Sequence, residues 1–130
     1  MTNQKSMRTA LGRVRHLGAA RTGTDHFWRQ RLTSVAAIPL SIAFIVILIA
    51  LLGRNHAAAV QILGSPLVAI VMMLFIVTSA YHMWLGMQVI IEDYVHHELT
   101  KLIILMCNTF FSFALGLACL YAILKLSFGV

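Results

Sequence analysis

The most informative segment of the chain is an apolar run with a histidine in its middle, SAYHMWLGMQVIIEDYVH at residues 79–96. An α-helix turns about 100° per residue, so a spacing of eleven residues returns to within about 20° of the same face. His82 and Asp93 have this spacing, and Gly86 and Val89 lie on the same stripe. The rise from His82 to Asp93 is roughly 16 Å, about half the thickness of a hydrocarbon core. The segment therefore predicts a transmembrane helix with a metal-ligand type near mid-membrane and a carboxylate at the membrane surface.

The composition indicates an integral membrane protein. Of the 130 residues, 60% are hydrophobic and 11% are charged, which is too apolar for a soluble domain. Three stretches lack Asp, Glu, Lys and Arg and reach the roughly 20 residues that a helical span needs: about 32–52, 67–91 and 102–124. We expect an all-α membrane protein with three transmembrane helices. A chain this small has few ways to shield a polar site from lipid, so we expect it to be part of a heteromeric helical bundle.

The positive charges gather ahead of the first span and predict the orientation. Seven of the ten Lys and Arg residues lie there: Lys5, Arg8, Arg13, Arg15, Arg21, Arg29 and Arg31. The positive-inside rule then puts the N-terminus in the cytoplasm, or in the matrix of a mitochondrion. The second span runs back inward, so Asp93 and Tyr94 lie on that same side. The net charge of +6 is explained by this anchoring and does not indicate a nucleic-acid partner.

This arrangement predicts a basic cytoplasmic tail at residues 1–23 and a three-helix anchor domain at residues 24–130. The basic head and the first apolar run are both too long for a cleaved signal peptide. Thr24 or Asp25 is a candidate cap for a helix beginning near His26. Pro39 falls inside the first span, where proline can kink a helix. Residues 53–65 are expected to form the outer connection, because they hold Gly53, Asn55, Gly64 and Ser65 and are followed by Pro66, all loop or helix-start residues.

His82 is the sharpest candidate for a functional residue, since ionisable groups are expensive inside a membrane. A neutral imidazole offers one nitrogen to a metal, while its other ring N–H needs a partner. The alternative is a packing histidine that bonds Ser79, Tyr81 or a neighbouring helix. Gly86, one turn further on, would let a flat macrocycle approach the backbone. It could equally serve a close contact between helices.

The other histidines near the membrane lie at its surfaces, His56 in the outer connection and His96 and His97 in the inner one. A six-coordinate haem at His82 would therefore need its second axial ligand from another subunit, either in a hetero-oligomer or in a homodimer that shares the haem. His96, His97 and Glu98 are adjacent in the inner connection, which is a weak metal signal, and a solvated loop is the favoured interpretation.

Asp93 and Tyr94 end the second span. A tyrosine hydroxyl can donate a hydrogen bond to a quinone carbonyl without carrying charge, and a neighbouring carboxylate can relay protons. A surface tyrosine beside a solvated acid is the simpler alternative. Arg29 and Arg31 suit haem propionates or lipid phosphates, because guanidinium pairs bidentately with planar anions, and ordinary anchoring explains them equally well.

Taken together, these residues resemble a known family. The chain has Arg31 at the head of the first span, Tyr81-His82-x-x-x-Gly86 in the second and Asp93-Tyr94-Val95 at its end. This combination resembles the small hydrophobic membrane anchor of succinate dehydrogenase (respiratory complex II). The segment GTDHFWRQRLT at residues 23–33 is similar to the alphaproteobacterial members. The likeness covers roughly residues 18–128, and the spacing from the histidine to Asp-Tyr is its most specific part.

The resemblance implies one chain of a four-chain succinate:ubiquinone oxidoreductase of the tricarboxylic acid cycle, without dehydrogenase chemistry of its own. The implied partners are a flavoprotein, an iron–sulfur protein, a second membrane chain of the cytochrome b type, and membrane lipid. His82 would be one axial ligand of haem b, shared with the cytochrome b chain. Tyr94 would bind the head group of the substrate ubiquinone, Asp93 would support that site and Arg31 would face a haem propionate.

Two alternatives remain open at this point. The chain could anchor a fumarate reductase, or it could be a purely structural anchor without haem. The bacterial inner membrane is favoured as the location over the mitochondrial inner membrane. The resemblance gives residues 1–17 no role.

Overall fold

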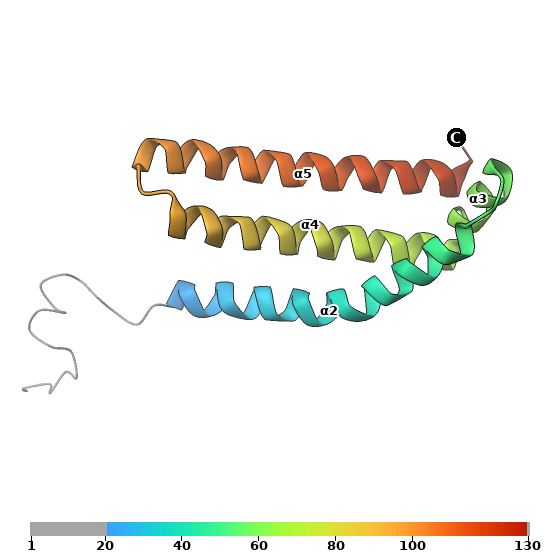
Figure 1. The fold of residues 1–130 in the computed structure, drawn as a ribbon, viewed down its shortest axis with the longest axis horizontal. Coiled ribbons are helices and arrows are strands. Elements are labelled where there is room, and N and C mark those ends of the chain that lie inside the picture. Colours follow the sequence, from blue (N-terminus) through green and yellow to red (C-terminus); the bar gives the residue numbers. More distant parts are fainter. Residues whose placement is uncertain (1–20, 130) are drawn as a thin grey trace, which may run out of the picture.

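The computed structural model describes residues 21–129, and this part of the chain folds into helices joined by short connections. The helices are α2 (Arg21–Leu51), α3 (His56–Leu63), α4 (Pro66–Tyr94) and α5 (Glu98–Phe128). Three of them, α2, α4 and α5, are long and apolar enough to cross a membrane. The prediction of an all-α protein with three transmembrane helices is confirmed. The three long helices lie side by side in one row, neighbours run in opposite directions, and α4 lies between α2 and α5 (Figure 1).

All three long helices extend beyond the charge-free stretches, because a helix continues past the hydrocarbon layer into the polar surface. The predicted start of the first helix is wrong, since α2 begins at Arg21 and both Thr24 and Asp25 lie inside it. Capping preferences are weak enough that such residues also occur within helices. Residues 1–20 of the expected basic tail lie outside the described residues.

Pro39 lies inside α2, and the helix bends along its second half (Figure 1). Proline has no backbone N–H to donate, and its ring collides with the carbonyl four residues earlier. The kink expected from the sequence is therefore present. The kink turns the last part of α2 toward α3, which lies at the end of the row of long helices (Figure 1).

The connection at residues 53–65 is more regular than expected, because it contains the short helix α3. The Asn55 side-chain oxygen caps this helix by accepting a hydrogen bond from the Ala58 backbone N–H at 2.9 Å. Three consecutive alanines, residues 57–59, have high helix propensity and extend the first turn. Gly64 ends the helix against the last turn of α5.

Gly64→Ala is expected to destabilise the fold by about 1–3 kcal/mol, since overpacking a close contact costs about that much. A Cβ at this position would lie 2.9 Å from the Leu126 carbonyl oxygen, which belongs to the backbone and cannot swing aside. Thermal unfolding in detergent measures the effect. Gln61→Ala, at an exposed position on α3, is the matched control and should leave the transition temperature unchanged. Equal transition temperatures for the two variants would contradict the expected contact.

The chain buries little of its own apolar surface, and what it buries centres on α4. The buried apolar residues among those described are Ala69, Leu85, Ile91 and Ile123. Phe44 of α2 stacks on Phe75 of α4 with ring centroids 4.5 Å apart. Many large apolar side chains on all three long helices stay exposed, and surfaces of this kind require lipid or a partner chain to cover them.

Candidate functional site

His82 lies half-buried between α4 and α2. Its Nδ1 is 3.0 Å from the Thr33 hydroxyl oxygen on α2. His82 is twelve residues before the end of α4 and Thr33 is twelve residues after the start of α2, so each lies roughly 18 Å from the same end of the row. The antiparallel packing of the two helices therefore brings them together at one depth.

The contact with Thr33 answers part of the question that the sequence left open. The expected partners of a packing histidine were Ser79, Tyr81 or a neighbouring helix, and the partner in the described chain lies on the neighbouring helix α2. A ligand histidine needs the same kind of contact for its second nitrogen. The bond is thus compatible with both interpretations, and it engages Nδ1 while leaving Nε2 for another partner.

Gly86 faces open space. A Cβ built on this residue would meet no atom of the described residues within 4 Å. The glycine that does serve a close helix contact is Gly116 of α5, where a Cβ would lie 3.3 Å from the Ala80 Cβ of α4. The interpretation of Gly86 as a helix-contact glycine within this chain is therefore not supported. One turn beyond His82, the backbone of α4 is open to something outside the chain.

Asp93 and Tyr94 form the exposed C-terminal end of α4, and 79% of the Tyr94 surface is accessible. This end is tied to α5, because the Lys101 ammonium donates a hydrogen bond of 2.9 Å to the Glu92 carbonyl. A cation at the C-terminus of a helix also complements the helix dipole. Glu92 itself accepts a hydrogen bond from the Gln88 side chain at 3.0 Å. The chain presents Asp93 and Tyr94 outward on a fixed helix end.

Arg31 is not brought to His82 within this chain. It follows Phe27 by one turn of α2, and its guanidinium carbon lies 4.7 Å from the centre of that exposed ring. Arg31 and Thr33 are two residues apart, which is about 200° around the helix, so they lie on nearly opposite faces of α2. The structure thus joins His82 to Thr33 and leaves Arg31 on an outer face at the same end.

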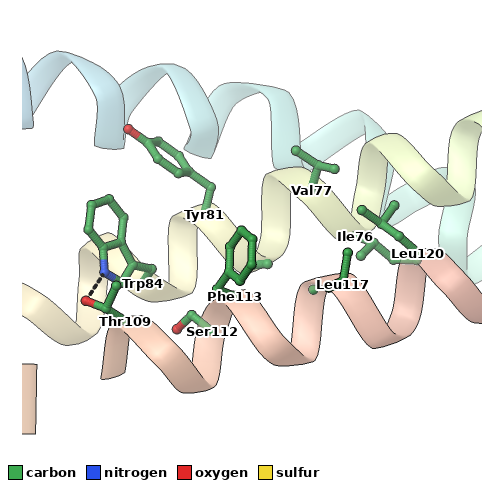
Figure 2. A pocket seen from close by; sticks show the side chains of 11 residues that line it. Ile76, Val77, Tyr81, Trp84, Thr109, Ser112, Phe113, Leu117 and Leu120 are labelled. Carbon is green, nitrogen blue, oxygen red and sulfur yellow. Dashed lines mark hydrogen bonds between the residues drawn. The ribbon is translucent and has the colours of Figure 1, made fainter. Parts of the chain in front are cut away.

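The best-defined hollow in the described chain lies elsewhere, between α4 and α5. It has a volume of about 380 Å³, and it is lined mainly by apolar side chains from both helices. Figure 2 shows Trp84 turned toward Thr109, whose hydroxyl oxygen accepts the indole N–H at 3.1 Å. His82, Asp93 and Tyr94 do not line it. The hollow therefore does not join the predicted site residues into a pocket.

A shallower hollow lies at the connection between α4 and α5, beside Glu92, His96 and Lys101. His97 precedes the first turn of α5, and its Nδ1 lies 3.3 Å from the Thr100 hydroxyl oxygen. Among the residues that the structure describes, no three His, Cys, Asp or Glu side chains gather in a way that could hold a metal ion.

Thr33 is the residue that sequence reasoning missed. It belongs to the segment that carried the resemblance, but nothing in its own position pointed to His82. The only signal available was a hydroxyl residue near the start of a charge-free span. That signal acquires meaning only once α2 is known to pack against α4.

Comparison with known proteins gives a consistent picture. Residues 5–120 match the family described as the succinate dehydrogenase/fumarate reductase transmembrane subunit. Among curated proteins, the chain is 26% identical over 113 residues to the succinate dehydrogenase hydrophobic membrane anchor subunit of Paracoccus denitrificans, covering 87% of each chain. It is 30% identical over 88 residues to the protein of the same name from Rickettsia bellii, covering 68% of this chain and 70% of the relative.

A third relative is the succinate dehydrogenase membrane anchor subunit of Reclinomonas americana, which is 26% identical over 91 residues and is covered over 76% of its length. No solved structure gives a significant match. The resemblance drawn from the residue pattern, including its alphaproteobacterial character, is confirmed by these matches.

Proposed function

The chain belongs to the succinate dehydrogenase/fumarate reductase transmembrane subunit family, and from this premise we propose that it helps to bind haem b and to form the ubiquinone-reduction site of a succinate:ubiquinone oxidoreductase. The observation that carries the haem proposal is the surroundings of His82. Its Nδ1 is engaged by Thr33, and the backbone one turn away at Gly86 is open. The membrane-anchor role itself follows from the family and from the three membrane-spanning helices.

The residues around His82 fit a haem. Imidazole is a common axial ligand of haem iron. The space beside Gly86 would admit the edge of a flat macrocycle, which a side chain at that position would obstruct. When bound, the haem would supply a one-electron redox centre. This chain's part would be to hold His82 through its contact with Thr33 and to leave Nε2 free to bind the haem.

The second axial ligand is proposed to come from the cytochrome b chain of the complex. The other histidines among the described residues lie near helix ends or between helices: His26 in the first turns of α2, His56 at the start of α3, and His96 and His97 in the connection between α4 and α5. His82 alone lies near the middle of a span among the described residues. A haem with two histidine ligands would therefore be shared across an interface between chains, which also covers part of the exposed apolar surface.

Tyr94 and Asp93 are proposed to form this chain's side of the quinone site. The exposed phenol can donate a hydrogen bond to a quinone carbonyl while remaining uncharged. Asp93, which directly precedes Tyr94 and is also exposed, can hold or pass a proton where the membrane meets water. Quinone reduction takes up two protons, so a site at the helix end, close to water, suits the reaction.

Arg31 is proposed to face a haem propionate from the outer face of α2. Its guanidinium contacts the ring of Phe27, which is neutral. This contact does not neutralise the positive charge of the guanidinium. A carboxylate supplied by a ligand at an interface between chains is a suitable counter-ion.

The basic residues ahead of α2 support an orientation with the N-terminus in the cytoplasm and the complex in the bacterial inner membrane. The start of α2, the end of α4 and the start of α5 lie at the same end of the row (Figure 1). In this orientation Asp93 and Tyr94 face the compartment where the flavoprotein and iron–sulfur partners would dock. We propose likewise that residues 24–130 form the anchor domain and that it assembles with the flavoprotein, the iron–sulfur protein and the cytochrome b chain.

Purification of the tagged chain from native membranes in a mild detergent tests the proposed function. The expected product contains flavin, iron–sulfur signals in electron paramagnetic resonance, a b-type haem band in the reduced-minus-oxidised spectrum, and succinate:ubiquinone reductase activity. A complex that reduces fumarate with a low-potential quinol much faster than it oxidises succinate would favour the fumarate reductase alternative. A complex with flavin and iron–sulfur centres but no haem would favour the purely structural anchor.

A further inference from the structure

We propose that Thr33 is a positioning residue for the haem ligand, and that its hydroxyl holds His82 as the tautomer with the proton on Nδ1. This inference rests on the haem-binding role proposed above. It is carried by the atoms around one oxygen. The Thr33 hydroxyl oxygen lies 2.9 Å from the Arg29 carbonyl oxygen, 3.0 Å from the Gln30 carbonyl oxygen and 3.0 Å from the His82 Nδ1.

Proton counting assigns the donors. A threonine hydroxyl has one proton and two lone pairs, whereas both carbonyl oxygens can only accept. A threonine inside a helix commonly donates to a carbonyl one turn earlier, and here two such carbonyls lie within reach. When the hydroxyl proton goes to α2, only lone pairs remain to face His82. The Nδ1–H of the imidazole then donates to the Thr33 oxygen.

A neutral imidazole carries a single N–H, so the proton on Nδ1 leaves the Nε2 lone pair free to bind a metal. The opposite arrangement would place the hydroxyl proton on the His82 side and a proton on Nε2, where it would block ligation. Two helix carbonyls compete with Nδ1 for the one hydroxyl proton, which disfavours that arrangement. α2 thus supports a ligand that α4 carries.

The contact should also tune the bound iron. An imidazole whose second N–H donates a hydrogen bond is a more basic ligand, and its ring orientation is restrained. A more basic ligand favours the ferric form and lowers the haem midpoint potential. Removal of the Thr33 hydroxyl should therefore raise that potential and weaken haem retention.

The test uses the purified complex with Thr33→Val, which keeps the shape of the side chain and removes the hydroxyl. We expect an upward shift of the haem midpoint potential in an optical redox titration. We also expect a roughly 10–100-fold loss of haem affinity, the usual effect of removing such a supporting contact, measured by haem transfer to apomyoglobin. Thr33→Ser retains a hydroxyl and should restore both values.

Ser34→Ala is the matched control. Ser34 is the next residue of α2, is also half-buried, and donates to the Gln30 carbonyl at 2.7 Å. Its loss should change neither the potential nor haem retention. If the valine variant does not assemble, Thr33→Ala takes the same measurements without introducing a methyl group where the hydroxyl was.

The outcomes separate this inference from the proposed function. A wild-type potential and haem affinity in Thr33→Val would overturn the role of Thr33 while leaving His82 as a ligand. A Thr33→Ser variant that shifts as far as the valine variant would overturn it too, because the methyl group rather than the hydroxyl would then matter. Failure of the haem proposal itself would appear in the wild-type complex, as the absence of a b-type haem.

Discussion

His82→Ala is expected to remove the b-type haem from the complex, and with it the haem band of the reduced-minus-oxidised spectrum. The variant deletes the one mid-span imidazole of the described chain, and alanine offers no atom to the iron. The loss should exceed the roughly 10–100-fold effect that follows when only a supporting residue is removed. Haem content per flavin in the purified complex measures it.

The fold should survive this change. His82 is half-buried, and its described hydrogen bond is with Thr33, whose hydroxyl has two backbone carbonyls as other partners. His96→Ala, in the exposed connection after α4, is the matched control and should keep its haem. A His82→Ala complex with normal haem content, normal potential and unchanged ligand-field signals in electron paramagnetic resonance would remove His82 from the ligand role.

Tyr94→Phe should slow ubiquinone reduction by about 10- to 100-fold while succinate oxidation by an artificial electron acceptor continues. The substitution removes a single hydroxyl that is proposed to donate to a quinone carbonyl. The quinone carbonyl, enclosed in its site in the complex, would then lack its hydrogen-bond donor. Leaving a buried polar group without its partner costs about 1–3 kcal/mol, and each 1.36 kcal/mol corresponds to tenfold in rate. Comparison of the two succinate-dependent rates on one preparation measures the effect.

The structure favours a clean readout for this variant. Tyr94 is 79% exposed at the end of α4, so little packing depends on its hydroxyl. Tyr121→Phe changes another exposed tyrosine, which lies near the C-terminal end of α5 and far from Tyr94, and should leave both rates unchanged. Unimpaired ubiquinone reduction by the Tyr94→Phe complex would count against the quinone role.

The spans could be predicted from sequence because their signal is local. A charge-free run of about 20 apolar residues has few alternatives in a bilayer, where every backbone polar group needs an internal partner. The same local logic found the kink at Pro39. Local signals gave the wrong start for α2. They also missed the helix α3, because the loop-forming residues at both ends of residues 53–65 led us to expect a loop there.

The candidate site divides in the same way. Helical periodicity alone aligned His82, Gly86 and Asp93, because the turn angle of a helix is the same in every sequence. The positions of Asp93 and Tyr94 on one helix end likewise followed from the limits of the charge-free span. The partner of His82 did not, since Thr33 is separated from it by 49 residues and by an intervening helix.

The sequence by itself determined that the chain has three apolar spans and that a histidine and an Asp-Tyr pair lie about half a membrane apart on one of them. It also carried the family likeness. Only the tertiary structure decided that α4 is the central helix, that Thr33 meets His82 and that Gly86 is left open. The physical reason is that composition and periodicity act along a single helix, whereas the faces that meet are selected by side-chain packing between distant segments.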